Sequence, residues 1–198
     1  MNSGVSEFDV LHGVRLRGVA STEALALRLD VTQVQVQTVI DVLLSGGQLI
    51  YREGRRVSGY VLTQEGKGRH AQEIAEQANG LREEMSKVYK QFLALNGRIK
   101  GMCSDWQEID DDTKRWVAID ELETFHAAAQ VIFKRAGVFI PRYSQYGQAL
   151  LVALELLVDG DYRYFTSPLV DSYHTVWFEV HEDFLMCLGI DRAAEGSF

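Results

Sequence analysis

Cysteine, proline and long apolar runs are all scarce in this chain. Its 198 residues include two cysteines, Cys103 and Cys187, and two prolines. Each cysteine lies in an apolar helical pattern, which favours buried, reduced thiols over a disulfide, and two thiols alone cannot hold a structural zinc ion. No apolar run approaches the roughly 20 residues of a membrane span, and the first residues do not resemble a signal peptide. We therefore expect a cytoplasmic protein with no membrane contact.

Motifs of catalysis are also missing. The chain contains no phosphate-binding loop, no nucleophile motif and no paired carboxylates in a recognisable setting. With 46% hydrophobic and 24% charged residues, its composition is that of an ordinary globular protein. We expect a folded protein that is not an enzyme.

Positive charge is scarce overall, but it is unevenly distributed. The formal net charge is −8. Residues 1–75 hold eight basic and eight acidic residues, whereas residues 76–198 hold 12 basic and 20 acidic residues. Within the neutral part, five basic residues stand against two acidic ones between positions 52 and 69. A net charge of this sign argues against a general nucleic-acid binder, so any contact with phosphate should concentrate in this short window.

The stretch VTQVQVQTVIDVLLSGG, residues 31–47, fits two kinds of element. Its first half alternates Val and Gln like a half-buried strand, but Val36, Ile40 and Leu43 have the spacing of one helix face. Thr32 and Gln35 also form a capping-box pair. The neighbouring segments 5–17 and 21–30 predict helices, which would leave a strand here without a partner. We therefore predict a helix.

Two β-prone runs follow, at 49–52 and 57–63, around a predicted turn at Glu53-Gly54. Three helices and a hairpin are the order of a winged helix-turn-helix. The stretch from ASTEALALRLD to LTQEGKGRH resembles the winged-helix domains of bacterial MarR-like transcriptional regulators, over roughly residues 8–75.

This resemblance implies that the third helix enters the major groove of double-stranded DNA and that the hairpin contacts the backbone. The residues that it places against DNA are Thr32, Gln33, Gln35, Gln37, Thr38, Arg52, Arg55 and Arg56. The third helix has no Lys or Arg, so the nonspecific affinity would come from the hairpin arginines. A homodimer would then be needed to double the phosphate contacts.

The remainder of the chain predicts a helical bundle. A heptad seam runs through Ile74, Ala78, Leu81, Met85, Val88, Phe92, Leu95, Ile99, Met102 and Trp106. A break or bend is expected near Gly80, because glycine weakens a helix interior. Further helices are predicted at 111–137, 141–160 and 167–189. We expect a mostly α protein with a small β-hairpin, in which residues 1–75 bind DNA and residues 76–198 form a helical domain for dimerisation and effector binding.

Two binding sites in the helical domain follow as hypotheses. The stretch ETFHAAA resembles the Phe-His motif of GntR-type regulators, which implies a metal site at His126 with Asp171 and His174. The carboxylate of that motif is replaced by Leu122, and buried histidines bonded to carboxylates are the alternative. No other cofactor is expected. Separately, Arg142 could anchor a small-molecule effector beside Tyr146, Tyr173, His174 and Trp177, although such aromatic residues are more often core.

The segment DYRYFTSPLVDSYHTVWFEVHEDF resembles uncharacterised bacterial regulator-like proteins associated with phosphoenolpyruvate-utilising dikinases. This resemblance implies an alternative function. The first hypothesis is a homodimeric DNA-binding transcriptional regulator, and the second is a non-DNA adaptor of a metabolic, phosphotransfer enzyme.

Overall fold

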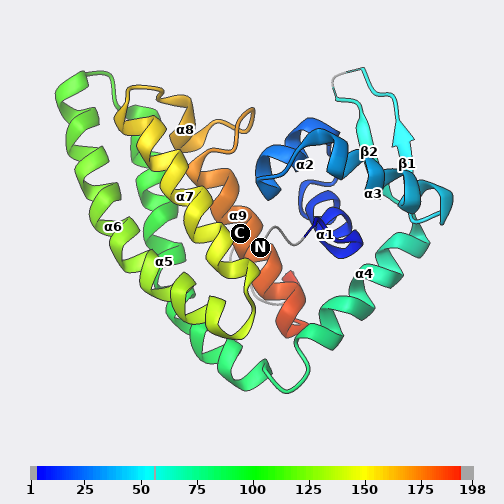
Figure 1. Ribbon diagram of the computed structural model, residues 1–198. Coiled ribbons are helices and arrows are strands. Elements are labelled where there is room, and N and C mark those ends of the chain that lie inside the picture. Colours follow the sequence, from blue (N-terminus) through cyan, green and yellow to red (C-terminus); the bar gives the residue numbers. More distant parts are fainter. Residues whose placement is uncertain (1–3, 56, 193–198) are drawn as a thin grey trace. The chain divides into compact units, whose positions relative to one another are not determined.

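The computed structural model describes residues 4–55 and 57–192 and divides the chain into two compact units, residues 1–77 and 78–198. Helices dominate both units, and one two-stranded antiparallel sheet lies in the first (Figure 1). The predicted class, mostly α with a small hairpin, is confirmed. Within the described ranges, no helix is both long and apolar enough to cross a membrane.

The first unit packs four helices and the hairpin around one apolar core. Its elements are α1 (Glu7–Arg17), α2 (Thr22–Leu29), α3 (Gln33–Ser45), β1 (Leu49–Arg52), β2 (Gly59–Leu62) and α4 (Gln64–Gln77). The core takes residues from the first three helices and β1, including Leu11, Leu25, Ile40 and Leu49. These side chains are at most 1% exposed, so the core is shielded from solvent although the unit is small.

The ambiguous stretch 31–47 is helical, as predicted. Thr32 caps α3: its side chain accepts a hydrogen bond from the Gln35 backbone, and the Gln35 side chain accepts one in return from the Thr32 backbone. Val36, Ile40 and Leu43 are fully buried. The alternating valine Val34 is 76% exposed. The alternation of Val and Gln therefore does not produce a strand, because the capping box and the buried face together favour the helix.

The hairpin differs from its predicted form at the turn. Arg52 pairs with Gly59, so the loop between the strands is longer than the expected turn at Glu53-Gly54, and β2 begins two residues later than expected. The Ser58 hydroxyl closes this loop by accepting a hydrogen bond of 3.1 Å from the Gly54 backbone. Ala20 and Tyr60 exchange backbone hydrogen bonds of 2.8 and 3.1 Å. Gly59 permits this approach, because a Cβ there would lie 2.6 Å from the Ala20 carbonyl oxygen.

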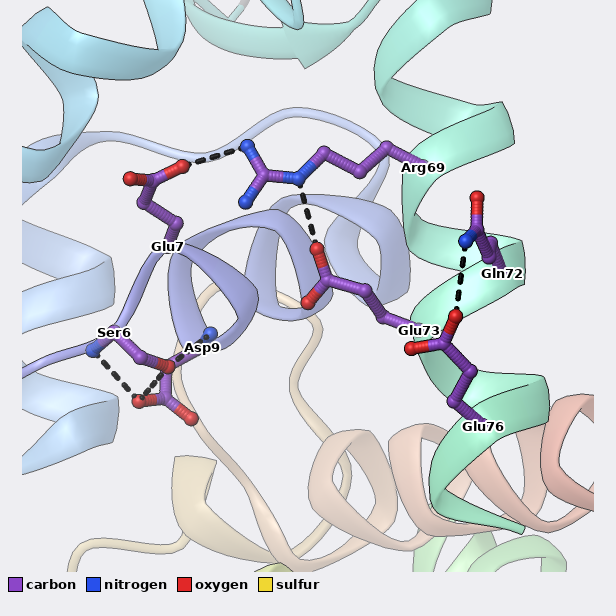
Figure 2. A network of polar contacts seen from close by, with 7 residues as sticks. All are labelled: Ser6, Glu7, Asp9, Arg69, Gln72, Glu73 and Glu76. Atoms are coloured by element: carbon purple, nitrogen blue, oxygen red, sulfur yellow. Dashed lines mark hydrogen bonds and ion pairs between the residues drawn. The ribbon is translucent and has the colours of Figure 1, made fainter. Parts of the chain in front are cut away.

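Polar contacts tie α4 to α1 (Figure 2). The Arg69 guanidinium donates to Glu7 at 2.6 Å and to Glu73 at 2.8 Å. Beside this network, the buried rings of His12 and His70 share a hydrogen bond of 3.0 Å between Nδ1 and Nε2. These contacts make α4 part of the first unit rather than an extension of the second.

The second unit is a bundle of four long helices, as expected. These are α5 (Arg82–Glu108), α6 (Asp112–Phe139), α7 (Arg142–Val158) and α9 (Tyr173–Leu188), with a short α8 (Arg163–Thr166) before α9. Helix α6 packs against α5 and α7, and α9 packs against the same two helices (Figure 1).

The heptad seam is interrupted near Gly80 and buried inside the chain. Gly80 has a φ of 74°, which ends the helical path between α4 and α5, so the predicted break is confirmed. Along α5, Val88 and Phe92 are fully buried. Phe92 stacks on Trp177 of α9 with ring centroids 4.6 Å apart. The heptad residues of α5 are therefore covered by other helices of the same unit.

The predicted start of the last helix is wrong. Helix α9 begins at Tyr173 rather than near Ser167, because Ser172 caps it by accepting a hydrogen bond from the Thr175 backbone. Residues 167–171 form a turn instead, in which Leu169 is 89% exposed. Helix α6 likewise passes through Gly137, where we expected it to stop, and ends at Phe139.

Candidate nucleic-acid interface

The exposed face of α3 is polar at some positions and apolar at others. Gln33 and Thr38 are exposed, as predicted. The Gln33 amide makes no hydrogen bond within the described parts of the chain, whereas the Thr38 hydroxyl donates to the Val34 carbonyl at 2.9 Å. Val34 and Val42 are 76% and 52% exposed. The helix has a single charged residue, Asp41, so this face can offer hydrogen bonds and methyl groups to a partner but no positive charge.

Two of the expected DNA-facing glutamines are occupied within the unit. Gln37 is half-buried rather than outward: its amide oxygen accepts from the Thr22 hydroxyl at 2.9 Å and its amide nitrogen donates to Asp41 at 2.8 Å. The Gln35 amide oxygen accepts from the backbone and the hydroxyl of Thr32 as part of the cap. A base edge would have to displace these partners, so Gln33 is the glutamine best placed to reach one.

The hairpin that follows α3 adds exposed positive charge. Helix α3 packs against β1, and Arg52 at the end of β1 and Arg55 in the following loop are both exposed. Neither forms an ion pair with any residue that the structure describes. Arg56, the third expected cation, lies outside the described residues. An unpaired guanidinium in water keeps its donors available for a phosphate.

His126 of the helical unit has both ring nitrogens occupied. The Gln130 side-chain nitrogen donates to the Gly147 carbonyl at 2.7 Å and contacts His126 Nε2 at 2.9 Å. Because that nitrogen can only donate, His126 Nε2 accepts, and Nδ1 carries the proton that it shares with the Tyr173 hydroxyl at 3.2 Å. Burial lowers the pKa of His126, which keeps the ring neutral.

The metal ligands suggested by the sequence do not assemble. Asp171 lies in the turn before α9, so it does not share a helix face with His174, and His174 is exposed. Nowhere in residues 4–55 and 57–192 do three or more His, Cys, Asp or Glu side chains gather closely enough to hold an ion. His126 acts instead as a buried hydrogen-bonding residue, with a tyrosine and an amide in place of the carboxylates we expected.

Most of the residues suggested for an effector are buried, whereas His174 is exposed. Tyr146, Tyr173 and Trp177 are at most 3% exposed, and the Trp177 indole donates to Asn96 at 3.0 Å. Arg142 forms a two-pronged ion pair with Asp183, at 2.7 and 2.8 Å. Binding of an acidic ligand by Arg142 would therefore require breaking this pair. Sequence reasoning missed Asp183. It is one of three acidic residues of α9, with Glu179 and Glu182, so its residue type alone did not mark it as paired.

Comparisons of the chain with protein-family models, with curated proteins and with solved structures found no match. The function is therefore inferred from the surfaces themselves.

Proposed function

We propose that residues 1–77 are a winged helix-turn-helix module that binds double-stranded DNA, and that the chain acts as a homodimeric transcriptional regulator. The observation that supports this most is an exposed face of α3, bearing Gln33 and Thr38, followed by a hairpin in which Arg52 of β1 and Arg55 after it are exposed. A glutamine amide can bond adenine at two points in the major groove. The arginines supply the attraction to phosphate that α3 lacks.

The small number of positive charges in the first unit limits the DNA affinity that we expect. Residues 1–75 have no net charge and few cations, so one copy would hold DNA weakly and a dimer would double the phosphate contacts. We expect sequence-dependent binding that weakens steeply as salt is added. The helical unit serves as the dimerisation domain in this proposal. No effector is included, since the suggested tyrosines and tryptophan are buried and Arg142 is paired with Asp183.

Selection from a random-sequence duplex library tests this function. We expect enrichment of a motif, and a binding constant for that duplex that falls linearly with salt on a logarithmic plot. The double change Arg52→Gln and Arg55→Gln should weaken binding to all duplexes alike, and should reduce the salt slope by roughly 0.9 for each phosphate that the protein no longer neutralises. The matched change Gln33→Ala should alter the preferred sequence and leave the slope in place. Failure to enrich any duplex would contradict the proposal.

A second candidate function is docking to a protein, as a non-DNA adaptor of a metabolic enzyme. It is favoured by the apolar part of the same surface, where Leu27 of α2 is 75% exposed and Val34 and Val42 of α3 also face outward. A pocket of about 350 Å³ lies beside them, lined by Ala26, Leu27, Asp30, Val31, Thr32 and Gln35. Indifference to all DNA, with loss of enzyme binding on Val34→Asp, would support this candidate instead.

A further inference from the structure

Helix α6 carries an exposed stripe whose spacing is the same when read from either end, with acidic residues in one half and basic residues in the other. The first half of the stripe contains a valine, two acidic residues and a threonine, and it ends at two central alanines. The second half mirrors these spacings with a valine, two basic residues and a final valine. The residues are Val117, Asp120, Glu121, Thr124, Ala127, Ala128, Val131, Lys134, Arg135 and Val138, and all are exposed. The spacing is symmetric about the midpoint between Ala127 and Ala128.

The bundle itself does not use this stripe. The opposite face of α6 is buried, through residues that include Leu122, Phe125 and Phe133. On the stripe, Val117, Val131 and Val138 are 64%, 66% and 80% exposed. With Thr124 they recur every seven residues, which is the period of a helix-pairing seam. The buried seam of α5 cannot pair with a further helix, because it is already packed within its own chain.

We propose that this stripe pairs with the same stripe of a second copy of the chain, with the two α6 helices antiparallel. A twofold axis between Ala127 and Ala128 then places Val117 opposite Val138 and Thr124 opposite Val131 of the other copy. The central alanines let the helix axes approach to about 8 Å. The paired region is about 32 Å long, since the stripe spans Val117 to Val138 at 1.5 Å per residue.

The charged residues of the stripe favour the antiparallel orientation of the two α6 helices. At 3.6 residues per turn, Asp120 and Glu121 lie on opposite sides of the apolar line, and so do Lys134 and Arg135. In the antiparallel arrangement Asp120 faces Lys134 of the second copy and Glu121 faces Arg135. A parallel arrangement would bring like charges together instead. Asp120 and Lys134 form no ion pair within the described chain, and Glu121 has an exposed one with Arg98 at 3.3 Å, which contributes little.

Charge reversal tests the pairing directly. The variant Asp120→Lys/Glu121→Lys and the variant Lys134→Glu/Arg135→Glu should each raise the dimer dissociation constant by at least about tenfold, because like charges then face each other at every pair. When the two variants are mixed, all the facing charges are again opposite. We expect a one-to-one heterodimer, measured by analytical ultracentrifugation and by native mass spectrometry of a mass-tagged partner.

Cross-linking tests the register. The variant Ala128→Cys places a thiol next to the proposed axis, so a short bifunctional thiol reagent should join two copies efficiently. Thr113→Cys, exposed on the same helix but far from the axis, is the control and should not be joined. The native thiols Cys103 and Cys187 are buried. Equal cross-linking at both positions would overturn the register.

The inference specifies the dimer of the proposed regulator and rests on that proposal only for its biological role. A wild-type chain that stays monomeric, or a dimer that neither reversal weakens, would overturn it. Because none of these measurements involves DNA, failure of the pairing and failure of DNA binding are distinguishable.

Discussion

At the scale of single residues, the Arg142–Asp183 pair stands out within the helical unit. The Asp183 side chain is 0% exposed and that of Arg142 is 11% exposed. Burial alone would lower the pKa of Arg142, but the nearby Asp183 raises it overall, so the guanidinium stays charged. Two buried charges are tolerated here because each satisfies the other with two aligned hydrogen bonds. This pair joins the start of α7 to α9.

Removal of the carboxylate should therefore be costly. We predict that Asp183→Ala lowers the free energy of unfolding by about 3–5 kcal/mol, because it leaves the Arg142 charge buried without a partner. The matched control is Asp161→Ala, which removes the carboxylate of an exposed pair with Arg163 and should change stability far less. Urea melts of both variants make the comparison. Equal losses of unfolding free energy in the two variants would show that burial does not set the strength of the Arg142–Asp183 pair.

At the scale of elements, α5 shows how one face of a helix is buried in the bundle. Its heptad residues face α6 and α9, and Phe92 contacts the rings of Trp177, His181 and Phe184. The outer face of α5 is polar and exposed. One face thus supplies most of the helix's stability, as the seam in the sequence predicts.

A charge on the inner face of α5 should disrupt the bundle. We predict that Val88→Asp lowers the free energy of unfolding by at least about 3 kcal/mol, because an isolated carboxylate would enter a fully buried position. Gln91→Asp adds the same charge at an exposed position of the same helix and should change stability by no more than about 0.5 kcal/mol. Thermal melts followed by circular dichroism measure both. A Val88→Asp protein that melts like wild type would mean that the seam is not packed as described.

At the scale of the whole molecule, charge and assembly are connected. The net negative charge lies beyond residue 75, and the exposed arginines of the hairpin belong to the neutral part. If DNA is bound by few cations per copy, affinity depends on having two copies on one duplex. Dimerisation through α6 and DNA binding through the first unit should then change together.

We predict that Asp120→Lys/Glu121→Lys lowers DNA affinity and reduces the salt slope by about half, since a monomer neutralises half as many phosphates. The variant Lys134→Glu/Arg135→Glu changes the charge in the opposite direction and should have the same effect. Mixing the two should restore both affinity and slope. Fluorescence anisotropy with a selected duplex measures them. If the two variants instead change affinity in opposite directions, and mixing has no effect, α6 acts through its charge rather than through the dimer.

The sequence by itself determined the features that depend on neighbouring residues. Thr32 and Gln35 cap α3 through atoms three residues apart, and the seam of α5 follows from a repeat along one helix. Gly80 ends a helix because of its own backbone freedom. Local hydrogen bonds and helical periodicity act within a few residues, so a pattern is enough to predict them.

Only the tertiary structure decided which side chains are available. Gln37 looks outward in the periodicity of α3, but Thr22 occupies its amide from another helix. Arg142 looks like an anchor for a ligand until Asp183, 41 residues away, is found beside it. His126 is held by Gln130 and Tyr173, while Asp171 stays in a separate turn. These outcomes depend on contacts between distant segments, and the pattern within one segment carries no record of what packs against it.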